Sequence, residues 1–86
     1  MHIVSGAHLW QREPSMYREG ISDQLREIER QVVEGERQLA ECEARLIELK
    51  RQNQDTDAAQ AELETLRSYQ RQREQERQRL LFLLHP

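Results

Sequence analysis

The 86-residue chain has one cysteine, two prolines and three glycines, and its scarce residues exclude several classes of protein. A single cysteine, Cys42, rules out a disulfide within the chain, and we expect a cytoplasmic protein. Aromatic residues make up 5% of the sequence, too few for a large globular core. The N-terminus lacks the pattern of a secretory signal. The longest apolar run, residues 80–84, is far shorter than the roughly 20 residues that cross a bilayer.

The sequence also lacks the residue patterns of catalytic and cofactor sites. None of its serines has a local histidine and acid for nucleophilic catalysis. Its glycines form no phosphate-binding loop, and His2, His8 and His85 have no second ligand at helical spacing. Cys42 falls among apolar residues, where a thiol behaves as a small hydrophobic group. We therefore expect no enzymatic activity, no cofactor and no metal.

Charge of both signs is what the sequence has in abundance. Charged residues make up 34% of the chain, with 16 acidic and 13 basic residues and a net charge of −3. The two signs alternate along the chain, which is typical of a solvated helix surface. A nucleic-acid-binding surface would instead require a basic stripe. Lys50 is the single lysine, and this bias toward arginine indicates a bacterial or phage source.

The first of two stretches of the chain carries a heptad repeat of mostly apolar residues, and the second continues the spacing with three polar members in its middle. Successive members are separated by alternating steps of four and three, which is the spacing of a coiled-coil seam. The first seam consists of Ile21, Leu25, Ile28, Val32, Gly35, Leu39, Cys42, Leu46 and Leu49. The second seam, in a shifted phase, consists of Ala59, Leu63, Leu66, Gln70, Arg73, Arg77, Leu80 and Leu84. We predict that the large apolar members of both seams, together with Cys42, form the core and the dimer interface.

The segment between the seams favours a turn. Residues 52–57 are polar, and their short side chains bond to nearby backbone groups in caps and turns. Either one long parallel coiled coil changes phase here, or the chain reverses and forms a helical hairpin. We favour the hairpin, because reversal brings the two seams together. It would place Cys42 opposite Leu66 and Leu39 opposite Gln70, with the polar middle of the second helix near Gly35.

The predicted fold is therefore all-α, an antiparallel helical hairpin of the coiled-coil type. We expect an irregular N-terminal arm over residues 1–14 and the hairpin over 15–86, with helices at about 18–52 and 58–84 and a turn at about 53–57. Since a lone hairpin cannot bury both seams, two copies should associate into a four-helix bundle. The paired arms would be roughly 45 Å long, and we expect the maximum dimension of the molecule to be nearer this value than the roughly 95 Å of one continuous helix.

The two ends of the chain carry apolar residues beyond those that the seams need. Leu80–Leu84 is apolar on every side of a helix, so Phe82 and Leu83 must face something other than the first helix. The N-terminal arm would bring Trp10 and Tyr17 to the same end. Either arm and tail cover each other, or they form an exposed patch for a partner. The predicted partner-binding residues are Trp10, Tyr17, Leu81, Phe82 and Leu83.

These observations predict a non-enzymatic protein-binding module, which acts as a small inhibitor, adaptor or assembly factor for a larger protein. The expected partners are a second copy of the chain and that larger protein, with no membrane. One alternative is a nucleic-acid-binding regulator, since residues 67–79 hold five arginines, although glutamates interrupt them. A dimeric helical hairpin resembles in outline the Rop family of RNA-binding regulators, although the chain matches none of its motifs. A further alternative is a purely structural oligomerisation element.

Overall fold

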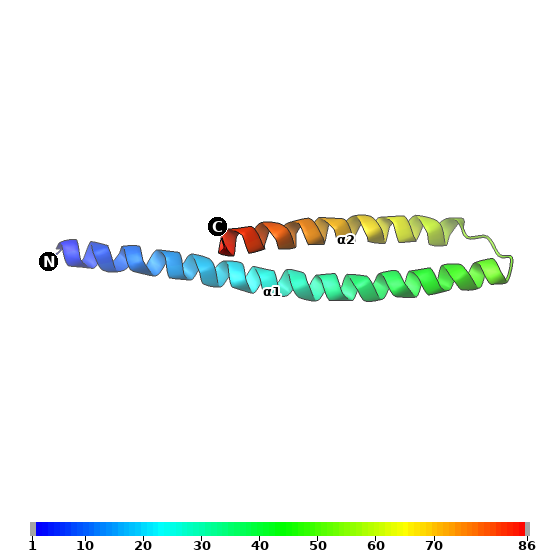
Figure 1. The fold of residues 1–86 in the computed structure, drawn as a ribbon, viewed down its shortest axis with the longest axis horizontal. Coiled ribbons are helices and arrows are strands. Elements are labelled where there is room, and N and C mark those ends of the chain that lie inside the picture. Colours follow the sequence, from blue (N-terminus) through cyan, green and yellow to red (C-terminus); the bar gives the residue numbers. More distant parts are fainter. Residues whose placement is uncertain (1, 86) are drawn as a thin grey trace.

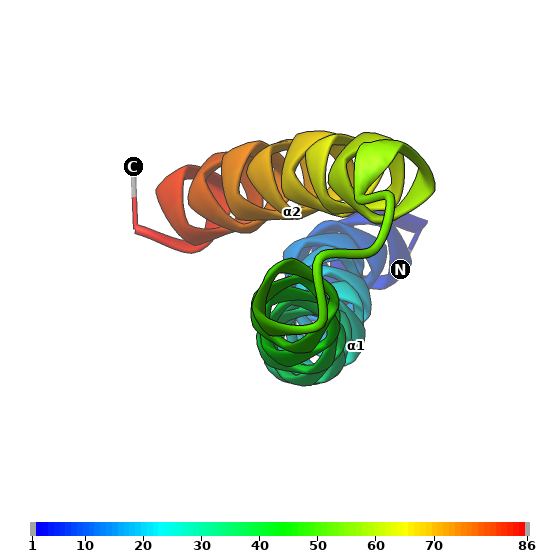
Figure 2. The same ribbon diagram turned by 90° about the vertical axis from the view of Figure 1, so that its right-hand side faces the viewer.

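The computed structural model describes the backbone of residues 2–85 and the side chains of residues 17–85. It contains two α-helices, α1 (His2–Arg51) and α2 (Asp57–Leu84), joined by a short loop (Figure 1). The helices lie side by side and antiparallel, and the end-on view shows α2 crossing over α1 (Figure 2). The predicted all-α helical hairpin is therefore confirmed, and a single continuous helix is excluded.

The loop at residues 52–56 reverses the chain through one left-handed residue. Asn53 has a φ of 55°, in the region that asparagine tolerates better than most side chains. The Asp55 carboxylate accepts a hydrogen bond of 3.0 Å from the backbone N–H of Asp57. Asp57 itself places a negative charge in the first turn of α2, where it interacts favourably with the helix dipole. The loop begins and ends one residue earlier than the predicted turn at 53–57.

The prediction of an irregular N-terminal arm over residues 1–14 is not confirmed. Helix α1 begins at His2 and continues through Pro14. A proline removes one helical hydrogen bond and can bend a helix without ending it. The first part of α1 therefore extends beyond the end of α2, and the molecule is 78 Å long (Figure 1). The paired arms have roughly the predicted length, but the expectation for the maximum dimension is wrong, because α1 extends past the end of α2.

The two seams are buried unevenly, because two helices cover each other from one side only. The buried core among the described residues consists of Ile21, Val32, Cys42, Ala59, Leu63 and Leu80. The other large apolar seam residues are only half-buried: Leu25, Ile28, Leu39, Leu46, Leu49, Leu66 and Leu84. Much of the predicted core thus remains in contact with solvent in a single hairpin.

A glycine and a glutamine form the middle of the hairpin. A Cβ on the buried Gly35 would lie 2.0 Å from Oε1 of Gln70 and 2.7 Å from a guanidinium nitrogen of Arg73. The Gln70 amide donates a hydrogen bond of 2.8 Å to the carbonyl of Val32. The missing side chain at residue 35 therefore lets Gln70 lie across the α1 backbone. Gln70 was predicted opposite Leu39, so the register differs by one helical turn.

Cys42 shows the same difference in register nearer the loop. Its thiol donates to the backbone carbonyl of Ala59 at 3.6 Å. A helical carbonyl points toward the residue four positions later, here Leu63, so Cys42 lies about one helical turn from its predicted position opposite Leu66. The earlier loop and the close contact at Gly35 both move α2 along α1 in this direction.

Ion pairs border the seam on both sides. Three of them, between described side chains, join the two helices: Arg45–Glu62 at 2.8 Å, Glu43–Arg67 at 3.8 Å and Glu29–Arg77 at 3.7 Å. All these groups are substantially solvated, and exposed pairs contribute at most about 1 kcal/mol each. These ion pairs mainly favour one register of the two helices and one choice of the faces that pack together.

We expect the stability effects of Gly35→Ala and Gln70→Ala to depend on each other. In the wild-type protein the new methyl group displaces Gln70, and the lost hydrogen bond offsets the roughly 1 kcal/mol that alanine gains over glycine in a helix. With Gln70→Ala already present, only the flexible end of the Arg73 side chain has to move, and Gly35→Ala should stabilise by up to about 1 kcal/mol. Urea unfolding of the four proteins measures this coupling, and a coupling below about 0.3 kcal/mol contradicts the proposed contact.

Cys42 should react slowly with thiol reagents in the folded protein, because its side chain is only 1% exposed. Modification then requires the hairpin to open, so denaturant should accelerate it by at least about 100-fold. A Gln54→Cys variant on a Cys42→Ala background places a thiol in the loop and should react at the rate of a free thiol. Rapid modification of native Cys42, or its ready oxidation to a covalent dimer, would contradict this burial.

Candidate protein-binding surface

The last turns of α2 are apolar all round, but α1 covers only one side of them. Leu80 is 2% exposed, whereas Phe82, two residues later, is 71% exposed. Leu81 and Leu83 are half-buried between these extremes. Successive residues of a helix point about 100° apart, so five consecutive apolar residues leave no polar side. The hairpin therefore holds this segment by one face and presents the opposite face to solvent.

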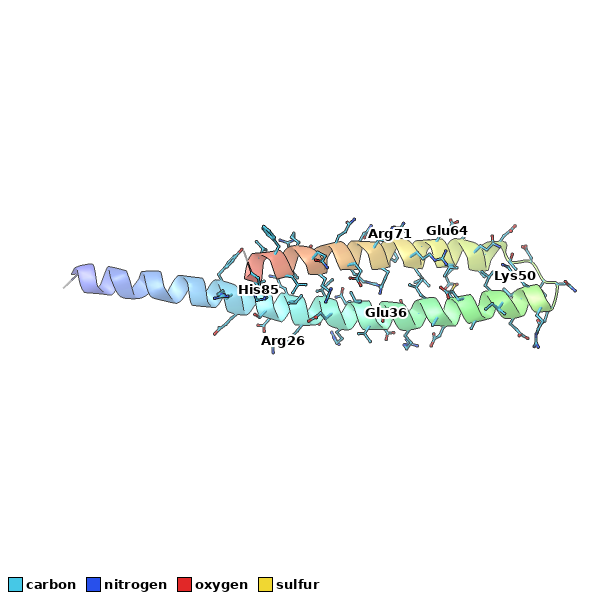
Figure 3. The ribbon with its side chains drawn as sticks, in the orientation of Figure 1. Arg26, Glu36, Lys50, Glu64, Arg71 and His85 are labelled. Atoms are coloured by element: carbon cyan, nitrogen blue, oxygen red, sulfur yellow. The ribbon has the colours of Figure 1, made fainter. Side chains whose placement is uncertain are left out.

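Residues of α1 complete this surface. The Arg18 guanidinium donates a hydrogen bond of 3.2 Å to the carbonyl of Leu84, one of the last carbonyls of α2, which lack helical partners. The neighbouring Tyr17 is 57% exposed. Figure 3 shows His85 at the same end, next to α1. We call this surface the end patch, and it consists of Tyr17, Leu81, Phe82 and Leu83.

An ion pair borders the end patch. The Arg79 Nε donates a hydrogen bond of 3.0 Å to the Glu76 carboxylate. This bond lowers the pKa of Glu76 and raises the pKa of Arg79, to which Tyr17 also contributes. Since the Glu76 pKa is lowered, any stability from the pair is present above the ordinary carboxyl pKa and is lost as the pH falls through the lowered value. An apolar centre with a charged rim is the usual composition of a protein-binding surface.

The structure brings four of the five predicted partner-binding residues to one end of the hairpin. The side chain of the fifth, Trp10, lies outside the described residues. Trp10 precedes Tyr17 by seven residues, so its backbone lies roughly 10 Å farther along α1. Helix α1 continues past the end of α2 instead of folding back, so the N-terminal backbone runs on beyond the C-terminal end of α2 (Figure 1).

Three other apolar side chains are exposed without having been predicted from the sequence. Val33, Ile47 and Tyr69 are 66%, 67% and 50% exposed. Val33 and Ile47 are two heptads apart, with the exposed Ala40 midway between them. Val33, Ala40 and Ile47 each directly follow a seam residue of α1. This second heptad row was the signal in the sequence, but it lies outside the two seam positions that define a coiled coil.

Other kinds of site find little support in residues 17–85. No three His, Cys, Asp or Glu side chains there gather in a way that could hold a metal ion. In the part of the chain that the structure describes, no helix has the length and apolar composition needed to cross a membrane. The described surface thus offers apolar contact and charge for binding.

Comparisons with known proteins give no family assignment. No protein-family model matches the chain, and neither a curated protein nor a solved structure matches it.

Substitutions at Leu80 and Phe82 should have very different effects on stability. Leu80→Ala removes a buried side chain and should cost about 2–4 kcal/mol. Phe82→Glu changes an exposed side chain and should alter the free energy of unfolding by less than about 0.5 kcal/mol. Urea unfolding followed by circular dichroism measures both values. A loss at Phe82 as large as that at Leu80 would mean that the ring is covered in the folded protein.

Proposed function

We propose that this chain is a non-enzymatic protein-binding module, which associates with itself and binds a larger protein as a small inhibitor, adaptor or assembly factor. The observation that carries the proposal is the end patch, where the highly exposed Phe82 lies two residues from the buried Leu80. Exposed aromatic and aliphatic side chains surrounded by charge are the usual anchors of protein–protein contacts.

The incomplete burial of the apolar seams supports self-association. The seven half-buried apolar residues of the seams lie along the whole length of the paired helices. Each can be covered further only by another helix, and two hairpins that form a four-helix bundle are the simplest way to supply one. We propose such a homodimer as the form of the protein in solution.

The length of the hairpin suits a role in joining or occluding larger proteins. Helix α2 has 28 residues and separates the end patch from the loop by roughly 42 Å. A partner bound at the end patch therefore leaves the loop end free. This geometry supports an adaptor or an inhibitor that inserts its apolar end into a pocket of its target.

Affinity capture with matched variants tests the role of the end patch. The tagged wild-type protein should retain a specific cellular protein, and Phe82→Glu should lose it, because a charge replaces the proposed anchor. Gln72→Glu, an exposed change ten residues earlier on α2, should retain it. Circular dichroism and sedimentation must show equal helicity and oligomeric state. Equal capture by all three proteins contradicts the proposal, and capture of nothing favours a purely structural oligomerisation element.

Binding to nucleic acid should be weak and sensitive to salt. Of the five arginines in α2, Arg67, Arg77 and Arg79 lie within ion-pair distance of glutamates. Few positive charges therefore remain to release counterions from phosphates. Fluorescence anisotropy with labelled RNA and DNA should give a Kd weaker than about 1 µM at physiological salt. A tighter Kd would make the nucleic-acid-binding regulator the better supported function.

A further inference from the structure

One side of the hairpin has an open groove between the two helices. Two hollows of about 420 and 340 Å³ form it, and they share Glu74 as a lining residue. Leu39 lies in the first hollow and Val32 in the second. Leu39 is only half-buried, so α2 does not fully cover the apolar floor of the groove.

The two walls of this groove carry opposite charges. The α1 wall has a glutamate every seven residues, and the α2 wall has a row of arginines. The members are Glu29, Glu36 and Glu43 on α1, and Arg67, Arg71 and Arg77 on α2. The Glu43–Arg67 and Glu29–Arg77 pairs join the rows and place them on the same side of the hairpin. Glu74 adds one carboxylate to the α2 wall, 3.9 Å from Arg77.

One charge of each row has no ion-pair partner among the described side chains. These charges are Glu36 and Arg71. Glu36 lies between Glu29 and Glu43, and Arg71 lies between their ion-pair partners Arg77 and Arg67. Glu36 and Arg71 therefore have about the same position along the length of the hairpin. Figure 3 shows Arg71 on the side of α2 turned away from α1, so it points outward from the groove rim. Both charges are therefore open to another chain.

The outer edge of the α1 wall is apolar. Val33, Ala40 and Ile47 follow one another at intervals of seven residues, and all three are exposed. The aliphatic parts of arginine side chains cover such surfaces while their charged ends reach carboxylates. A wall of arginines is thus a suitable contact for this edge, as it is for the glutamate row beside it.

We infer that a second copy of this chain covers the groove, with α1 of each copy against α2 of the other and both loops at the same end. The inference rests on the self-association proposed above. A two-fold axis parallel to the helix axes creates this arrangement. Each residue then has the same position along that axis in both copies. Glu36 of each copy then meets Arg71 of the other, and neighbouring helices are antiparallel. A two-fold axis across the hairpin would instead oppose the two glutamate rows, which repel.

Charge exchange between Glu36 and Arg71 tests the contact. Glu36→Arg and Arg71→Glu should each raise the dimer Kd at least about 10-fold, since each places like charges together twice in the dimer. The double variant restores opposite charges and should recover a Kd within about 3-fold of the wild type. Glu41→Arg is the control, because residue 41 lies roughly 140° round α1 from residue 36 and should leave the Kd within about 3-fold. Sedimentation equilibrium measures each Kd, with circular dichroism to confirm helicity.

The distance between the two loops tests the symmetry independently. Spin labels on Gln54→Cys, with Cys42→Ala, should lie within about 25 Å of each other, which is roughly two helix diameters. Loops at opposite ends would be roughly 45 Å apart or more. A long distance, or a double variant that stays dissociated, overturns this inference and leaves self-association in place. A chain that is monomeric at about 100 µM overturns both the inference and the proposed homodimer, while partner capture through the end patch is judged separately.

Discussion

Two helices that lie side by side touch along a single line, and most features of this molecule follow from that constraint. Where the line passes, side chains such as Cys42 and Leu80 are almost fully buried. A few ångströms to either side, apolar seam residues such as Leu39 and Leu46 are only half-covered. The chain therefore has more apolar surface than its own fold can bury, and this surplus lies along the groove and at the end patch. Contact with other chains is the chemistry that such a surface offers.

The charged residues decide how that surplus is used. Exposed ion pairs contribute at most about 1 kcal/mol each, so they are a minor part of the free energy of folding. Their placement nevertheless distinguishes one side of the hairpin from the other, since glutamates line the α1 wall of the groove and three arginines with one glutamate line the α2 wall. Apolar contact supplies attraction without direction, and the charge rows supply the direction.

The hairpin was predictable because its signals are local. A change of heptad phase and a run of turn-forming residues lie next to each other in the sequence, and the loop begins within one residue of its predicted position. The register was not predictable, because sliding α2 by one turn still brings leucines together. The choice depends on Gln70 reaching Gly35, two residues far apart in the chain. The start of α1 was missed because a helix that faces no partner needs no apolar period. The four residues of the end patch were predictable, because the periodicity of a single helix shows which side chains its partner helix leaves uncovered. The groove was not predictable, because its lining depends on how the two helices are rotated relative to each other.

Gly35 has a consequence for how this protein can change over generations. A side chain at residue 35 would displace the end of the Gln70 side chain from its hydrogen bond to Val32, so the two positions are coupled. Descendants that gain a methyl group or more at position 35 should carry a shorter residue at position 70, and those that keep the glutamine should keep the glycine. Correlated changes at positions 35 and 70 in related sequences would therefore indicate the same antiparallel register. They would identify the hairpin even where the apolar seams have diverged.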